Sequence, residues 1–236
     1  SFTRLESFKL SYNYFSGILP DFIGKLERLQ FLQFNNNHFE SSIPIQWNNL
    51  TRLGVLQLQG NLIDGNLKNF FSNSRNMALI NLDLSDNLIT GNIPNEIFQI
   101  YNLRTIALGS NCFHGTIPDG ICSAERLNLI SFDGLSSSFN CKKYFTFQLS
   151  KVTVVDTVDG TIPSCIWNMP YLITLHMMGN GLTGSLNIPY TRLSSSIRDI
   201  NLAHNYLTST IPKALQLFTY QKLDLSYNKL TGDITD

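Results

Sequence analysis

The sequence predicts an α/β repeat protein, a single solenoid in which short parallel strands form one long sheet. Three observations support this fold class. An apolar pattern recurs about every 24 residues, an asparagine follows nearly every copy at the same position, and a glycine and a proline return in the second half of most repeats. A unit of this length cannot bury a hydrophobic face alone, so successive units must stack to build one continuous core.

The apolar pattern is typical of a short strand that is buried on one side. Residues 29–37 (LQFLQFNNN) and residues 103–111 (LRTIALGSN) both follow the pattern L-x-x-L-x-L-x-x-N, with Phe34 at one apolar position. Alternating apolar residues such as Leu56 and Leu58 direct one face of a strand into a core. We expect strands from successive repeats to pair in parallel, about 4.8 Å apart.

The recurrent asparagine is expected to close each strand. Its side chain can bond backbone groups where the chain turns away from the sheet, which makes a buried polar group tolerable. The eight asparagines, spaced 23 to 26 residues apart except for one step of 69, are Asn13, Asn37, Asn61, Asn87, Asn111, Asn180, Asn205 and Asn228. A ninth copy of the strand pattern, residues 127–132, lies inside the long step, with Leu135 where the asparagine would stand.

The second half of the repeat is also regular. It follows the pattern x-[LF]-x-G-x-[IL]-P, as in residues 15–20 (FSGILP), or a close variant of it, as in residues 89–94 (ITGNIP) and 113–118 (FHGTIP). This pattern resembles the plant-type leucine-rich repeat, the extracellular subclass found in receptor-like kinases, receptor-like proteins and polygalacturonase-inhibiting proteins. The resemblance implies a leucine-rich-repeat solenoid of about nine repeats over residues 1–236, with a concave parallel sheet and with 3₁₀ turns and short strands on the convex side. Because the terminal repeats are incomplete, we expect the chain to be part of a larger receptor-like or secreted protein.

The sixth repeat carries an insertion, residues 136–155, before the pattern resumes at residues 159–163 (DGTIP). The insertion contains a run of basic and aromatic residues: Lys142, Lys143, Tyr144, Phe145 and Phe147. One interpretation is a surface loop that tolerates extra length. The other, by resemblance to receptors in which an island folds onto the concave face, is a contribution to the ligand pocket.

All four cysteines of the chain lie around this insertion. If the insertion loops out, the segment with Cys165 stacks on the segment with Cys122, and Cys112 stands beside the point where the insertion, with Cys141, leaves. We therefore expect the disulfides Cys112–Cys141 and Cys122–Cys165, which indicate an oxidising compartment. Four buried thiols in an intracellular protein are the alternative. The sequence has no C-x-x-C pair and no histidine at zinc-finger spacing, so we expect no metal site.

Composition and charge exclude several kinds of partner. The 17 basic and 17 acidic residues balance, which gives no electrostatic reason to expect nucleic acid or an anionic membrane as a partner. No apolar run approaches the ~18 residues of a membrane helix, so we expect no membrane insertion within these residues. The single N-x-[ST] sequon, at Asn49 in an expected turn, favours a glycosylated protein that is secreted or at the cell surface.

The concave face is the expected ligand site, because its outward side chains are not needed for the core. Two areas of the predicted sheet differ from the rest: an apolar pair on a face that is otherwise wet, Phe31 and Val55, and a polar cluster that contains two histidines. The candidate ligand-binding residues are Phe31, Gln33, Val55, Gln57, Asp83, Asp86, His176, Asp199, Asn201 and His204. A solvated sheet face without a fixed partner is the alternative for each of them.

These features predict a non-catalytic recognition module that binds a protein, peptide or glycan and needs no cofactor. The sequence has no G-x-S-x-G elbow, phosphate loop or H-E-x-x-H motif, and an open sheet does not exclude water from a reaction. Two other classes stay open, a structural or adhesive cell-surface protein and an inhibitor of a secreted hydrolase. Fold alone does not choose among the three.

Overall fold

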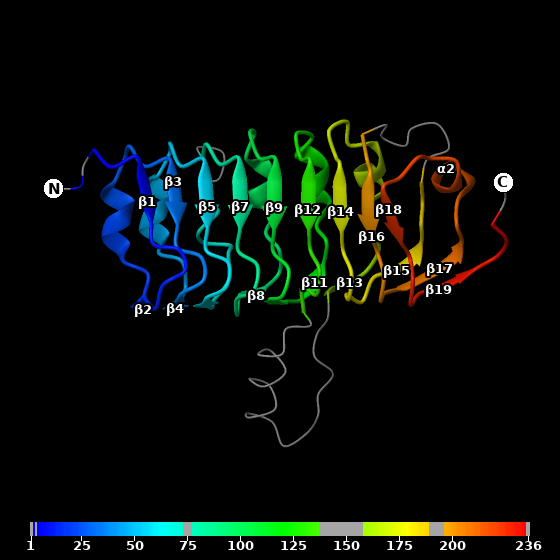
Figure 1. Cartoon of the computed structure of the whole chain (residues 1–236), viewed down its shortest axis with the longest axis horizontal. Coiled ribbons are helices and arrows are strands. Elements are labelled where there is room, and N and C mark those ends of the chain that lie inside the picture. Colours follow the sequence, from blue (N-terminus) through cyan, green and yellow to red (C-terminus); the bar gives the residue numbers. More distant parts are fainter. Residues whose placement is uncertain (1, 3, 73–76, 137–157, 189–195, 235–236) are drawn as a thin grey trace, which may run out of the picture.

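Nine short parallel strands lie side by side in one sheet that runs the length of the molecule (Figure 1). The computed structural model describes the chain apart from residues 1, 3, 73–76, 137–157, 189–195 and 235–236. The strands follow sequence order and are β1 (Ser7–Lys9), β3 (Phe31–Gln33), β5 (Val55–Gln57), β7 (Asn81–Asp83), β9 (Thr105–Ala107), β12 (Leu129–Ser131), β14 (Thr174–His176), β16 (Asp199–Asn201) and β18 (Lys222–Asp224). The predicted leucine-rich-repeat solenoid is thereby confirmed, with the two termini at opposite ends of the sheet.

The second half of most repeats forms a further short strand, as the resemblance implies. These strands make four small parallel sheets: β2 (Ser16–Ile18), β4 (His38–Ser41) and β6 (Leu62–Ile63); β8 (Thr90–Gly91) and β10 (Cys112–Phe113); β11 (Gly115–Thr116) and β13 (Val158–Asp159); β15 (Thr183–Ser185), β17 (Tyr206–Thr210) and β19 (Lys229–Thr231). The glycine of the pattern is left-handed, with φ of 86° at Gly91 and 81° at Gly115. Such a conformation favours glycine because it has no Cβ, which explains why the pattern repeats this residue.

A proline precedes each helix on the convex side. The 3₁₀ helices are η1 (Asp21–Lys25), η2 (Ile45–Asn49), η4 (Asn95–Gln99), η5 (Asp119–Ser123) and η6 (Ser164–Asn168), and a short α-helix, α2 (Lys213–Gln216), takes the equivalent place near the C-terminus. The prolines are Pro20, Pro44, Pro94, Pro118, Pro163 and Pro212. Each proline lies just outside its helix with an extended backbone, and its carbonyl can accept the first helical bond, as that of Pro94 accepts the N–H of Ile97 at 3.2 Å.

The core lies between the long sheet and the convex helices. The central residue of most strands in the sheet is buried, as at Leu32, Leu56 and Leu82, and the buried indole of Trp47 packs into the same core from η2. The indole N–H of Trp47 donates to the carbonyl of Pro20, 3.1 Å away, in the preceding repeat. Stacked repeats therefore share one continuous apolar interior, as the sequence pattern requires.

The asparagine ladder also forms as predicted. Asn87 is 2 % exposed; its Oδ1 accepts the N–H of Ile63 at 3.0 Å, and its Nδ2 donates to the carbonyls of Leu58 and Leu84 at 3.0 and 3.1 Å. Equivalent bonds are made by Asn37, Asn61, Asn111, Asn180, Asn205 and Asn228. Each asparagine thus ties its own turn to the repeat before it.

The ladder changes at Leu135, where the asparagine is missing. The N–H of Phe113 donates to the backbone carbonyl of Leu135 at 2.9 Å instead of to an asparagine side chain. The N–H of Leu135 in turn donates to Oδ1 of Asn180 at 2.9 Å. Backbone atoms therefore replace one rung of the ladder at the place where the insertion begins.

The predicted insertion, residues 136–155, lies outside the described residues except for Ser136, and so do the five basic and aromatic residues named within it. Ser136 is buried, and its hydroxyl accepts the N–H of Val158 at 3.1 Å. At Val158 the repeats stack again, because β13 pairs with β11 and places Asp159 opposite Thr116.

Candidate ligand-binding site

The strand register aligns the concave side chains in the columns that the sequence predicts. One column runs from Lys9 through Gln33, Gln57, Asp83, Ala107, Ser131, His176 and Asn201 to Asp224, and a second from Ser7 through Phe31, Val55, Asn81, Thr105, Leu129, Thr174 and Asp199 to Lys222. These side chains are exposed or half-buried, whereas the residue between them points into the core on every strand of the sheet except the last, where Leu223 is exposed. The sheet therefore offers an ordered surface whose side chains are free to contact a ligand.

The N-terminal part of this face is apolar. The Phe31 side chain is 42 % exposed, and the half-buried Val55 lies opposite it on the next strand. In the neighbouring column the side-chain amide of Gln33 donates to that of Gln57. An exposed phenyl ring beside a fixed pair of amides offers both apolar contact and hydrogen bonds within two adjacent repeats.

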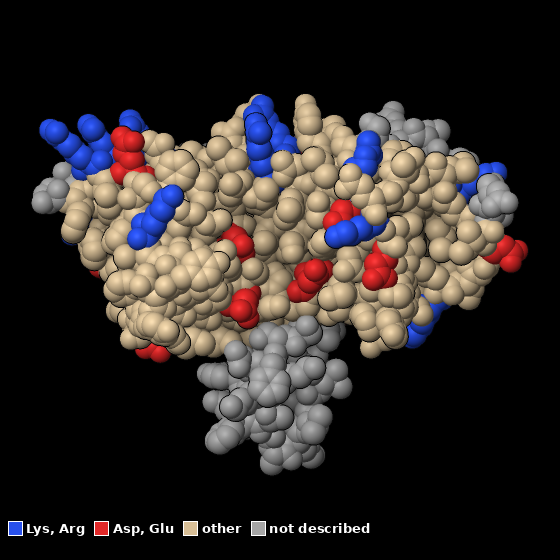
Figure 2. Space-filling model, viewed as in Figure 1, with Lys and Arg blue, Asp and Glu red and all other residues tan. Residues whose placement is uncertain are grey.

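The middle of the face is polar and tied to the backbone. The Asp83 carboxylate accepts the backbone N–H of Ser85 at 3.1 Å and its hydroxyl at 2.6 Å. Asp86 is exposed and left-handed, with φ of 53°, at the position directly before the ladder asparagine. Figure 2 shows acidic side chains across this face and basic ones mainly near its upper edge.

A histidine between two carboxylates marks the C-terminal half of the face. His176 Nε2 lies 3.0 Å from Asp199 Oδ1, and His176 Nδ1 lies 3.8 Å from Asp133 Oδ2. Asp133 Oδ1 accepts the N–H of Met178 at 2.7 Å. Burial raises the pKa of the Asp133 carboxyl above its ordinary value, although the Met178 N–H and His176 act in the opposite direction.

Asp133 was not among the residues that the sequence singles out. It stands two positions before Leu135, in a column next to those that the strand pattern identifies. The signal for it was available, since the register of the sixth repeat aligns Asp133 with Met178, two residues after His176. The absence of the ladder asparagine in that repeat made the position less conspicuous.

The predicted polar cluster of His176, Asp199, Asn201 and His204 forms in part. The structure brings His176 and Asp199 together, while the Asn201 amide donates to Met178 Sδ at 3.6 Å. His204 stacks on Tyr227, with ring centroids 4.1 Å apart and ring planes 10° from parallel. Its left-handed backbone, with φ of 54°, places it at the turn after the strand, so its described ring contact is with Tyr227 in the next repeat.

A disulfide joins two convex helices behind this half of the sheet. Cys122 in η5 and Cys165 in η6 are bonded, with Cα atoms 5.6 Å apart, as the sequence predicts. Cys112 is also in a disulfide, and its expected partner Cys141 lies outside the described residues. Asn49, the sequon asparagine, is exposed at the end of η2.

Two further properties concern the described part of the chain alone. Within it, no group of three or more histidine, cysteine, aspartate or glutamate residues is arranged to hold a metal ion. No helix in the same residues is long and apolar enough to cross a membrane.

Known proteins resemble this chain in both sequence and fold. The family model described as Leucine Rich Repeat matches residues 4–26 and 78–100. Receptor-like protein 39 of Arabidopsis thaliana is 29 % identical over 259 residues, which cover 96 % of this chain and 29 % of that protein. The chain is thus similar to plant leucine-rich-repeat proteins. Receptor-like protein 35 of the same plant is 31 % identical over 63 % of this leucine-rich-repeat chain and 17 % of its own length, so the chain spans less than a third of these curated relatives.

Solved structures agree with this assignment. The leucine-rich-repeat ectodomain of the Arabidopsis receptor kinase HAESA, determined with an N-terminally extended IDA peptide hormone, has a TM-score of 0.79 and 29 % identity, covering 96 % of this chain and 34 % of that one. A plant ice-binding protein has the same TM-score of 0.79 at 21 % identity, covering 98 % of this chain and 67 % of that one. The second likeness shows that the two proteins share a fold.

Proposed function

We propose that this leucine-rich-repeat chain is a non-catalytic recognition module of a secreted or cell-surface protein, and that its concave sheet binds a peptide or a segment of a protein. The observation that carries the proposal is the exposed ring of Phe31 beside Val55 on that sheet. Neither side chain is needed to fill the core, and burying an exposed aromatic ring against a partner is favourable. The HAESA ectodomain, which is similar over nearly the whole chain, was solved with a peptide hormone, and this supports a peptide as the ligand.

The polar groups of the face suit an extended peptide. The Gln33–Gln57 amide pair offers donors and acceptors close to Phe31. Farther along the sheet, Asp133 and Asp199 flank His176 and present carboxylates to a basic side chain or an amino group. A peptide lying across the strands would meet an apolar contact at one end and a charged one at the other, which fixes its direction.

An extracellular location accounts for the covalent features. Disulfides persist in oxidising compartments, and both Cys122–Cys165 and the disulfide of Cys112 are formed. Asn49 is exposed in the sequon, where a glycan meets no steric obstacle from the core. The intact mass of natively produced protein, before and after reduction and glycosidase treatment, tests this location. Two disulfides and a glycan on Asn49 are expected, and four free thiols without a glycan would overturn it.

Two matched substitutions test the concave face. Phe31→Ser removes an exposed ring from the sheet, and Phe22→Ser removes an equally exposed ring, 43 % against 42 %, from η1 on the convex side. Peptides selected on the wild-type chain from a displayed library of linear peptides serve as probes, and affinity is measured by biolayer interferometry. We expect Phe31→Ser to weaken binding at least about tenfold and Phe22→Ser to leave it unchanged. Equal effects of the two substitutions, or selection of no peptide, would refute the proposal.

A further inference from the structure

A polar pocket lies away from the concave sheet, at a point where the repeat is irregular. It encloses about 670 Å³, is open to solvent on one side, and has no lining residue in the nine-stranded sheet. In the repeat that begins at Asn61, Leu67 and Lys68 stand where the next repeat has Ile93 and Pro94. The small convex sheets also divide at this place. Among the described residues, β6 and β8 belong to different small sheets, and a single bridge between Asn66 and Thr90 pairs the convex strand segments of the two repeats.

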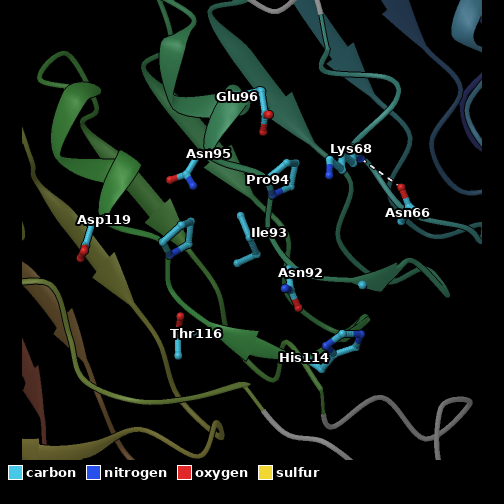
Figure 3. A pocket seen from close by; sticks show the side chains of 12 residues that line it. Asn66, Lys68, Asn92, Ile93, Pro94, Asn95, Glu96, His114, Thr116 and Asp119 are labelled. Carbon is cyan, nitrogen blue, oxygen red and sulfur yellow. Dashed lines mark hydrogen bonds between the residues drawn. The ribbon is translucent and has the colours of Figure 1, made fainter.

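This irregularity explains why a pocket exists here. Regular repeats present the same outline and stack without leaving a hollow. Here the repeat lacks the proline, and 26 residues separate Asn61 from Asn87 where 24 separate Asn87 from Asn111. Figure 3 shows the pocket, with Asn66 and Lys68 on one side, Asp119 on the other, and Asn92 and Thr116 between them.

The asparagine side chains that line the pocket are held in place. Asn66 Oδ1 accepts the N–H of Lys68 at 3.2 Å (Figure 3). Asn95 Oδ1 accepts the N–H of Gly120 at 3.0 Å. These bonds use the amide oxygens and leave the two NH₂ groups to donate to a ligand. The Asn92 amide lies over Gly115, where an added Cβ would come within 2.8 Å of its Oδ1. Groups that are already ordered bind at a lower entropic cost than mobile ones.

The remaining lining groups define the chemistry of a ligand. The carboxylates of Glu96 and Asp119 accept hydrogen bonds, and the Thr116 hydroxyl both donates and accepts. The basic residues of the described lining are Lys68 and His114. With two carboxylates beside them and no arginine to bind a phosphate or a sugar acid, the lining does not favour an anionic ligand. Pro94 supplies an apolar surface at the base of the same pocket.

We propose that this pocket binds one or two residues of a neutral oligosaccharide. A sugar hydroxyl is both donor and acceptor, which matches a lining of amides, carboxylates and a hydroxyl. The C–H faces of a sugar ring can pack on the proline, and a neutral sugar is not repelled by the carboxylates of the lining. The site is separate from the concave face, and the proposal does not depend on the peptide binding proposed above.

Two threonines at the same position of different repeats provide the test. Thr116 follows the left-handed Gly115 and lines the pocket, whereas Thr210 follows the left-handed Ser209 and lies outside it; both are exposed. Thr116→Trp fills the pocket, and Thr210→Trp adds the same ring elsewhere on the surface. The probes are soluble oligomers of β-linked glucose, xylose and mannose, with an oligogalacturonate as the charged comparison and a linear peptide as the protein-type comparison, and binding is measured by isothermal titration calorimetry.

We expect at least one neutral oligomer to bind with a micromolar to millimolar Kd. Thr116→Trp should weaken it by at least about tenfold, a free-energy loss of about 1.4 kcal/mol, while Thr210→Trp leaves it unchanged. Binding of no neutral oligomer, equal loss in the two variants, or binding of the oligogalacturonate or the peptide that Thr116→Trp weakens more than it weakens binding of the neutral oligomer would each overturn the proposal. Thermal unfolding of both variants shows whether they are folded. If Thr116→Trp alone unfolds, Asn92→Ala takes its place with the same expected loss.

Discussion

Removing one rung of the asparagine ladder tests the physical account of the fold most directly. Asn87→Ala deletes a side chain that is 2 % exposed and that bonds both its own repeat and the one before it. The substitution leaves the N–H of Ile63 without its acceptor and removes the donor to the carbonyls of Leu58, Leu84 and Ser85. Alanine is small enough to fit, so the loss comes from hydrogen bonding and not from a steric clash.

The expected cost follows from the number of bonds lost. A buried N–H without a partner costs about 1–3 kcal/mol, and each further hydrogen bond contributes roughly 1 kcal/mol or less when its carbonyl retains another partner. A water molecule that enters the vacated space recovers part of this loss. We therefore expect Asn87→Ala to destabilise the surrounding repeats by about 2–4 kcal/mol, against less than about 0.5 kcal/mol for the exposed Asn92→Ala.

Local probes are needed, because long repeat arrays depart from two-state unfolding. Urea unfolding followed by the fluorescence of Trp47, and hydrogen exchange of the Ile63 amide, report on the repeats next to Asn87, while the buried Trp167 reports on the other half of the chain. The Trp47 transition should move to lower urea, and exchange at Ile63 should become faster. A destabilisation below about 1 kcal/mol, or equal shifts for Asn87→Ala and Asn92→Ala, would refute the role given to the ladder.

Two other predictions concern the C-terminal half. Replacing Cys122 and Cys165 together by serine opens a link across 43 residues, which should lower stability by about 2–4 kcal/mol in urea unfolding, and an unchanged midpoint would contradict the structural role of the bond. Burial raises the pKa of the Asp133 carboxyl above 3.8, so the folded state favours its protonated form. The contribution of this group to the free energy of unfolding is therefore fully present below pH 3.8 and is lost as the pH rises through the raised pKa. Asp133→Asn, which keeps an acceptor for the Met178 N–H, should therefore melt higher than the wild type at about pH 7 and approach it at about pH 4. A melting-temperature difference that does not depend on pH would contradict this.

The sequence predicts the regular part of this structure in detail because each repeated residue has one physical task. Leu56 faces the core, Asn87 satisfies the turn, Gly115 takes a left-handed conformation, and Pro94 begins a helix. With those tasks assigned, the strand register follows, and with it the concave columns. The pairing of Cys122 with Cys165 follows from the same stacking, once the insertion is allowed to loop out.

Side-chain partners were harder to predict, because they depend on rotamers and on local changes of the backbone. The sequence groups His204 with His176, whereas the left-handed turn places His204 against Tyr227. It also passes over Asp133, which completes the site around His176. Both residues lie next to the strands and not within them, where the period of two no longer determines the direction of a side chain.

The polar pocket and the cluster around His176 both lie near departures from the repeat, and there is a physical reason for this. A residue that stacks on identical copies of itself forms a uniform row, which cannot distinguish one part of a ligand from another. Lys68, in place of a proline, lines the polar pocket at the point where only the bridge between Asn66 and Thr90 continues the described convex strand pairing. Leu135, in place of the asparagine, marks the repeat in which Asp133 reaches His176 on the next strand. The regular positions of the solenoid thus supply its stability, and the irregular ones supply the differences between repeats that specific recognition requires.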